Sequence, residues 1–145
     1  MTHQINFTFQ ESDWTTPTHY PNLKDAEIIA IDLETKDPDI KTKGPGWPSM
    51  NGNIIGISVA TDSFKGYYPI SHEAGSNMDA KMVLNWVQDV CRAPGVKVFH
   101  NAAYDIGWLR AHGIIVYGKI ADTMIAAALI DENRRNYSLN SLSLD

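Results

Sequence analysis

The sequence has little of what marks several large classes of protein. Among its 145 residues Cys91 is the single cysteine, which rules out an internal disulfide or a thiolate zinc cluster and suits a reducing compartment. No stretch approaches the roughly 20 apolar residues of a membrane span, and the first residues lack the basic and apolar regions of a secretory leader. We therefore expect a soluble, cytoplasmic protein.

Positive charge and phosphate-binding loops are also scarce. The chain has 12 Lys and Arg against 17 Asp and Glu, a formal net charge of −5, so it lacks the basic character of a protein that coats nucleic acid. An enzyme that holds a few nucleotides through bound metal ions is not excluded, because the metals supply the positive charge. The glycine-rich phosphate loop of many kinases and ATPases is absent. The length and the 43% hydrophobic content suit one globular domain.

Residues 27–35, Glu-Ile-Ile-Ala-Ile-Asp-Leu-Glu-Thr, are the stretch around which we expect the fold to form. Four consecutive apolar residues predict a strand buried on both faces, at the centre of a sheet. Asp32 and Glu34 at its end share one face, with Cα atoms about 6.6 Å apart. Such a pair can share one divalent cation, or place one oxygen on each of two cations about 4 Å apart. Solvated carboxylates at a strand end would give the same tripeptide, so this pattern alone leaves both interpretations open.

The rest of the chain alternates between patterns typical of strands and of helices. Further strands are predicted at 54–60, 66–70, 96–99 and 114–117, and the short links between the first ones favour antiparallel pairing with the central strand. Helices are predicted at 77–92, from Asn101 to His112, from Asp122 to Ile130 and from Ser138 onward. The expected apolar stripes are Met82, Val83, Trp86, Val87 and Val90 in the first helix, capped by Asn77, and Ala102, Ile106 and Leu109 in the second.

The segments outside this pattern fall at the two ends and after the central strand. Residues 1–24 predict a short strand at 5–9 and a proline-bearing strap anchored by Trp14, and residues 25–145 form the main domain. Residues 36–53, with three prolines and three glycines, form a long loop that leaves directly from the carboxylate pair and is either functional or an ordinary surface loop. Because the sequence stops within a helix that has only begun, we expect the front part of a longer polypeptide.

A third carboxylate lies where the strand at 96–99 meets the next helix. Asp105 falls in the first turns of that helix, whose N-terminus favours an anion by about 0.3 to 1 kcal/mol. Asn101 lies four residues earlier, on the same helix face. Taken singly, Asp105 suits a helix-dipole partner and Asn101 an N-cap. Together with Asp32 and Glu34, however, they place three carboxylates where one fold can bring them to a single edge of the sheet.

These two acidic stretches resemble the first two motifs of the 3′→5′ exonucleases that use four acidic residues, the DEDD superfamily. Asp32-Leu33-Glu34-Thr35 resembles the first motif and the stretch from Val98 to Leu109 resembles the second. The flanking residues resemble phage and bacterial family A DNA polymerases: Trp14, Pro17 and Pro21, then Asp122-Thr123-Met124, then Tyr137 to Leu142. The resemblance covers nearly the whole chain, as the proofreading domain of such a polymerase.

The resemblance implies an α/β, ribonuclease H-like fold: a mixed sheet of three antiparallel strands and then parallel strands, flanked by helices. It implies two Mg²⁺ or Mn²⁺ ions, with Asp32 bridging both, Glu34 holding the first and Asp105 the second. It implies further that Thr35, Asn101 and Tyr104 lie close to the 3′-terminal nucleotide of a single-stranded DNA end. Tyr104 would offer its ring to the base or sugar, although a half-buried core tyrosine is an equally good interpretation.

The family's third motif, Tyr-x3-Asp or His-x4-Asp, is not found in its expected place. No Tyr-x3-Asp occurs, and the His-x4-Asp from His100 to Asp105 overlaps the second motif, while Asp122 suits a helix cap. We therefore expect the third motif on the remainder of a polymerase, and about 10² to 10⁴-fold weaker hydrolysis by this chain alone. Two alternatives stay open: a non-catalytic module that binds a nucleic-acid end or a polymerase, and an exoribonuclease of the same superfamily.

Overall fold

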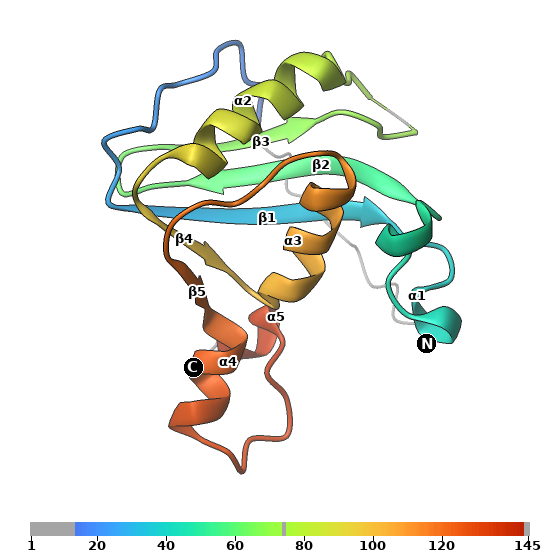
Figure 1. Cartoon of the computed structure of the whole chain (residues 1–145), viewed down its shortest axis with the longest axis vertical. Helices are drawn as coiled ribbons and strands as arrows, with labels where there is room; N and C mark the ends of the chain where they lie inside the picture. Colours follow the sequence, from blue (N-terminus) through green and yellow to red (C-terminus); the bar gives the residue numbers. More distant parts are fainter. Residues whose placement is uncertain (1–13, 74, 144–145) are drawn as a thin grey trace, which may run out of the picture.

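The computed structural model describes residues 14–73 and 75–143, which form an open sheet with helices packed against it (Figure 1). The sheet has five strands in the order β3-β2-β1-β4-β5. Strands β1, β2 and β3 pair antiparallel, whereas β1, β4 and β5 pair parallel. The expected mixed α/β sheet is confirmed. The strands are β1 (Ile28–Lys36), β2 (Asn53–Ala60), β3 (Lys65–Pro69), β4 (Val96–Phe99) and β5 (Ile120–Asp122).

Helices follow the strands and also interrupt the long loop. They are α1 (Ile40–Lys43), the 3-10 helix η1 (Trp47–Ser49), α2 (Ala80–Arg92), α3 (Ala102–Ala111), α4 (Thr123–Ile130) and α5 (Leu139–Leu142). The loop after β1 is therefore folded, since it contains α1 and η1. Within the described ranges, none of the helices has the length and apolar character needed to cross a membrane. The strand expected at 5–9 lies outside the described residues.

The alternation of side chains along β1 decides which face of the sheet carries the core. Ile29, Ile31 and Leu33 are buried in one hydrophobic cluster with side chains of α2 and α3. Each such burial is worth about 1.5 to 3 kcal/mol, so the register of β1 is strongly fixed. Asp32 and Glu34 alternate with these residues and consequently lie on the opposite face.

Helix α2 begins three residues later than predicted. Asp79, rather than Asn77, caps it by accepting a hydrogen bond from the Met82 N–H at 2.8 Å. The predicted stripe was also wrong in one position, because Met82 remains 56% exposed. The residues that α2 buries are Val83, Trp86, Val87, Val90 and Cys91. In α3, Ile106 is only half-buried, and Trp108 packs in the core instead.

The fifth strand lies at Ile120–Asp122, so the prediction of a strand at 114–117 was wrong. The alternation that suggested it has another cause: Ile114 is buried and Val116 packs against the core, while Ile115 and Tyr117 face outward. This stretch crosses the molecule without pairing in the sheet. Pairing with β4 begins only after Gly118, whose φ of +81° suits a glycine and turns the chain.

Contacts along its length fasten the N-terminal strap to the rest of the domain. Tyr20 stacks on Tyr68 with ring centroids 5.8 Å apart, and the indole N–H of Trp86 donates to the Pro21 carbonyl at 2.8 Å. Trp14, the expected anchor, contacts Tyr67 but remains 48% exposed. The strap is therefore fastened to α2 and β3, at Tyr20 and Pro21 as well as at Trp14.

Candidate active site

The topology brings the three predicted acidic residues toward one edge of the sheet. Strands β1 and β4 run parallel, with Ala30 beside Val98. The carboxyl ends of these two strands therefore point to the same edge of the sheet. Asp32 and Glu34 lie on β1 just beyond this pair, and Asp105 lies in the first turn of α3, which follows β4. An edge formed by the carboxyl ends of parallel strands is where α/β folds place ligands.

Electrostatics shows that these carboxylates act on one another. Asp105 is only 3% exposed. Burial raises the pKa of Asp105 to about 7, and the negative charges of Asp32, Asp122 and Glu34 add to the rise. Burial and the charge of Glu34 also raise the pKa of Asp32, while His100 opposes them. In the described part of the chain no Lys or Arg forms an ion pair with Asp32, Glu34 or Asp105, so the cluster accumulates negative charge.

A fourth carboxylate, Asp122, joins two helix starts instead of completing this group. It accepts hydrogen bonds from the N–H groups of Asn101 and Ala102, at 3.1 and 2.7 Å, and from Met124 and Ile125 at 2.9 and 3.4 Å. Burial disfavours its charge, but these backbone donors outweigh burial and lower the pKa of Asp122. The structure agrees with the expectation of a cap, and adds that the cap serves α3 as well as α4.

The predicted substrate residues fall into two places. Thr35 and Tyr104 meet directly, with their hydroxyl oxygens 2.8 Å apart. The Tyr104 hydroxyl also donates to Asp37 at 3.0 Å, and Asp37 accepts from the Gly46 N–H at 2.9 Å. Asn101 stands apart from this group at the start of α3, exposed and with a φ of +67°, and its side chain does not cap the helix.

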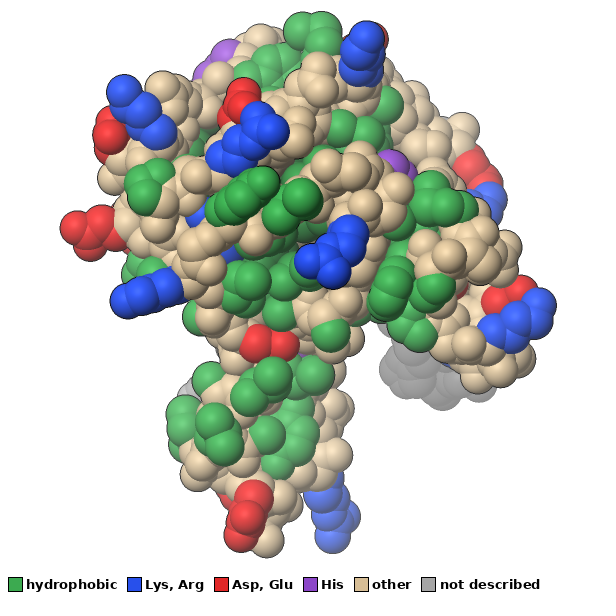
Figure 2. Space-filling model, in the orientation of Figure 1, with side chains coloured by type: hydrophobic (Ala, Val, Ile, Leu, Met, Phe, Trp, Pro, Cys, Tyr) green, Lys and Arg blue, Asp and Glu red, His purple; other side chains and the backbone are tan. Residues whose placement is uncertain are grey.

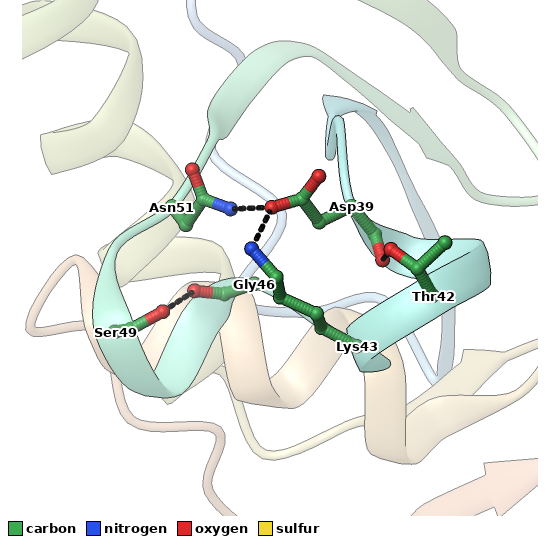
Figure 3. A network of polar contacts seen from close by, with 6 residues as sticks. All are labelled: Asp39, Thr42, Lys43, Gly46, Ser49 and Asn51. Atoms are coloured by element: carbon green, nitrogen blue, oxygen red, sulfur yellow. Dashed lines mark hydrogen bonds and ion pairs between the residues drawn. The ribbon is translucent and has the colours of Figure 1, made fainter.

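The long loop is fastened onto α3 by glycine and tryptophan. The ring of Trp47 lies against Gly107, where an added Cβ would fall 2.5 Å from the indole. A second network closes the loop on itself (Figure 3). In it Asp39 accepts from Lys43 at 2.7 Å and from Asn51 at 3.1 Å. The loop that leaves the acidic pair is therefore held as a folded unit beside Tyr104.

His100 connects the site to the C-terminal part of the chain. Its ring nitrogens lie 2.9 Å from the Thr123 hydroxyl and 2.8 Å from the Tyr137 carbonyl oxygen. A groove of about 700 Å³ opens on the face of the sheet that carries Asp32. Its lining residues include Asp32, His100, Tyr67 and Trp14. The acidic edge thus borders a groove with aromatic and apolar walls.

The three carboxylates are chemically suited to bind a hard divalent cation. Asp32, Glu34 and Asp105 offer only carboxylate oxygens, the ligands that Mg²⁺ and Mn²⁺ prefer. The raised pKa values of Asp32 and Asp105 reflect in part a repulsion that a cation would relieve. Among the described residues, however, no three His, Cys, Asp or Glu side chains are arranged closely enough to hold a metal ion as they stand. The residues therefore fit such an ion by chemistry and charge, and closing the site requires side-chain rotation or a further donor.

Several of these residues carried no functional signal in the sequence. Asp37 stands within a polar loop, and its link to Tyr104 joins residues 67 positions apart. The double role of Asp122 depends on a turn that returns to Asn101 across 21 positions. The position of His100 beside the second acidic stretch suggested that it lies near the site. That position did not predict which groups the His100 ring contacts.

An open mixed sheet with three carboxylates brought to one edge defines a ribonuclease H-like nuclease fold. The chain belongs to the 3′-5′ exonuclease family of family A DNA polymerases, whose model matches residues 18–144. A DNA-directed DNA polymerase of Pseudomonas phage M6 is 36% identical over 94% of this chain, and DNA polymerase I of Borreliella burgdorferi is 30% identical over 79%. The chain spans only 22% and 12% of the length of these two relatives.

Solved structures agree on the fold. The polymerase domain of Pol1 from M. smegmatis, in complex with DNA primer-template and dNTP, superposes with a TM-score of 0.59 at 14% identity, over 83% of this chain and 19% of the other. NrnC of Brucella melitensis with bound Mg²⁺ superposes with a TM-score of 0.54 at 19% identity, over 84% of this chain and 55% of NrnC. At these identities the likeness shows the fold alone.

Proposed function

We propose that this chain forms the metal-binding part of a 3′→5′ exonuclease that removes nucleotides from the 3′ ends of DNA during proofreading. The observation that carries the proposal is the convergence of Asp32, Glu34 and Asp105 at one sheet edge, with mutual charge repulsion. Two divalent ions, Mg²⁺ or Mn²⁺, held by these carboxylates would supply the positive charge that activates water and stabilises the leaving 3′ oxygen. Residues 25–145 make up this domain, and residues 1–24 serve as its strap.

The chain's own side chains would orient the DNA end. Thr35 and Tyr104 are joined through their hydroxyls, so the Tyr104 hydroxyl is engaged within the protein. That leaves the ring of Tyr104 to contact the terminal nucleotide by stacking. Asn101 has an exposed side chain that is not used as a helix cap, which leaves its amide to contact the same nucleotide.

We propose further that the active enzyme needs the remainder of a DNA polymerase, acting in the cytoplasm of a host cell. No Tyr-x3-Asp occurs in these residues, so the fourth acid and the group that accepts a proton from water have to come from elsewhere. The groove beside Asp32 and the exposed apolar helix α4 offer surface against which further polypeptide can pack. The relatives support this arrangement, because each is a much longer polymerase.

Hydrolysis of a 5′-labelled single-stranded DNA oligonucleotide with Mn²⁺ tests the proposal, with EDTA, Asp32→Ala and an RNA oligonucleotide of the same sequence in parallel. We expect a faint ladder from the 3′ end of DNA, about 10² to 10⁴-fold weaker than for an intact domain, and absent with EDTA and in Asp32→Ala. Activity near that of an intact domain would overturn the expected weakness. A ladder on RNA alone would indicate an exoribonuclease, and neither hydrolysis nor Asp32-dependent Mn²⁺ binding would indicate a non-catalytic module.

A further inference from the structure

The acidic edge has a second flank, formed by β3 and the turn that follows it. Across the antiparallel strands, Asp32 pairs with Ser58 and Ser58 pairs with Tyr67. Residues that pair in this way point to the same face, so Asp32 and Tyr67 both face the groove, which they line together. The neighbouring Tyr68 points to the other face and is fully buried in the core.

The side chain of Tyr67 leans across β2 toward Glu34. Gly56, the residue on β2 that pairs with Glu34, has no side chain. A Cβ on Gly56 would lie 2.0 Å from the Tyr67 hydroxyl oxygen, so this hydroxyl occupies the place of the missing side chain. Directly opposed side chains in an antiparallel pair begin about 4.5 to 5.5 Å apart, so the Tyr67 hydroxyl points toward the side of β1 that carries Glu34. Burial raises the pKa of Tyr67, and the charge of nearby Glu34 adds to the rise.

The tyrosine hydroxyl is held in that place by His72. The Tyr67 hydroxyl forms a hydrogen bond with Nε2 of His72. The backbone of His72 is itself fixed by Asn77, whose side chain accepts from its N–H and donates to its carbonyl, both at 2.8 Å. The turn is tied back to the end of β1 by the ion pair of Glu73 with Lys36. These contacts hold a polar pair against the site, on the side away from Asp105.

We propose that Tyr67, oriented by His72, is a positioning residue that holds the Glu34 carboxylate in the orientation in which it binds a divalent metal ion. With the proton on Nε2, His72 donates to the Tyr67 oxygen, and the phenolic hydrogen is left to donate to Glu34. A donor that hydrogen-bonds a metal-binding carboxylate from behind fixes the orientation of that carboxylate. The inference rests on the proposed function, since it assigns Glu34 to the metal ion.

The affinity for Mn²⁺ alone, followed through the electron paramagnetic resonance of the free ion, tests the inference on the 145-residue chain. We expect Tyr67→Phe, which keeps the ring and removes the hydroxyl, to raise the Mn²⁺ Kd about 10-fold. His72→Ala should raise it as well, and the double variant should lose no more than the worse single variant, because the two residues act in series. His72→Gln should largely restore affinity, since its amide N–H can donate to the tyrosine oxygen.

Tyr68→Phe is the matched control, because it removes a hydroxyl from the same strand on the opposite face, where that group donates to the His19 carbonyl. Circular dichroism and thermal unfolding of each variant report folding. Equal Mn²⁺ affinities for Tyr67→Phe and Tyr68→Phe would overturn the inference and leave the proposed function standing, even if Tyr67→Phe unfolded at a lower temperature. Wild-type protein that binds no Mn²⁺ in an Asp32-dependent way would overturn both.

Discussion

At the scale of single residues, Asp105 carries a carboxyl group into the protein interior beside other acids. Burial first, and then the charges of Asp32, Asp122 and Glu34, raise its pKa from 3.8 to about 7. Between these values the folded state binds more protons than the unfolded state, so the free energy of unfolding falls as the pH rises from about 4 to about 7. Ionised Asp105 therefore destabilises the metal-free protein at neutral pH.

We expect Asp105→Asn to be more stable than wild type above pH 7, by about 2 to 4 kcal/mol, because the amide cannot ionise. The difference should disappear at about pH 3, below both pKa values, where Asp105 is protonated in both states. Urea unfolding at a series of pH values without metal measures it. A gain that is the same at about pH 3 and at about pH 8 would mean that packing, and not ionisation, separates the two proteins.

The acidic residues could be predicted from the sequence because each follows a strand pattern that fixes its place. Asp32 and Glu34 end an apolar run, and Asp105 starts a helix after another. The groups around them could not be predicted in this way. The contact of Tyr104 with Asp37 spans 67 positions, and it depends on how the long loop packs, which no local pattern specifies.

At the scale of elements, the loop after β1 depends on close contact between η1 and α3. In most helices Gly→Ala stabilises by about 1 kcal/mol through helix propensity. At Gly107 the added methyl would meet the Trp47 ring at 2.5 Å, so the ring has to move. We expect Gly107→Ala to destabilise by about 1 to 3 kcal/mol and to expose the loop to proteases.

Thermal unfolding and limited proteolysis of the loop measure this effect. Ala103→Gly, on the exposed side of the same helix, is the matched control. It should cost about 1 kcal/mol through helix propensity alone and leave the loop protected. A Gly107→Ala protein that is more stable than wild type would contradict the packing of Trp47 on α3.

The double cap at Asp122 offers a second test at this scale. An ordinary N-cap contributes about 0.5 to 2 kcal/mol. Asp122 accepts from backbone N–H groups of both α3 and α4, so we expect Asp122→Ala to destabilise by about twice the effect of Asp79→Ala, which removes a single cap from α2. Urea unfolding of the two variants gives the comparison. Equal losses would show that one of the two helix starts does not depend on Asp122.

The elements that were predicted wrongly share a physical cause. Ile114 and Val116 alternate like a strand because they pack on the core, but backbone pairing is what makes a strand. Strand β4 pairs with β1 on one side and with Ile120–Asp122, not with residues 114–117, on the other. In the same way, Asn77 is a good helix cap by residue type, yet its amide is used by His72. A local sequence pattern predicts reliably which side chains are buried. It predicts less reliably which backbone groups pair in a strand or form hydrogen bonds with a side chain.

At the scale of the whole molecule, α4 and α5 project from the sheet as an arm (Figure 1). Helix α4, Thr-Met-Ile-Ala-Ala-Ala-Leu-Ile, is apolar all round yet buries none of its residues. Leu129 and Ile130 are 83% and 86% exposed, and Figure 2 shows hydrophobic side chains spread over this lobe. A helix with this composition is normally covered by other protein.

We expect the isolated chain to self-associate through this arm as its concentration rises, because association removes the apolar surface of α4 from water. Leu129→Gln combined with Ile130→Lys should weaken that association, with the melting temperature and Mn²⁺ affinity unchanged, since neither side chain contacts the core or the acidic edge. Sedimentation velocity over a concentration series measures it. Met82→Gln, which replaces an exposed apolar residue on α2, is the control and should leave association as in wild type. If both variants weakened association equally, general hydrophobicity would account for it and α4 would have no special part.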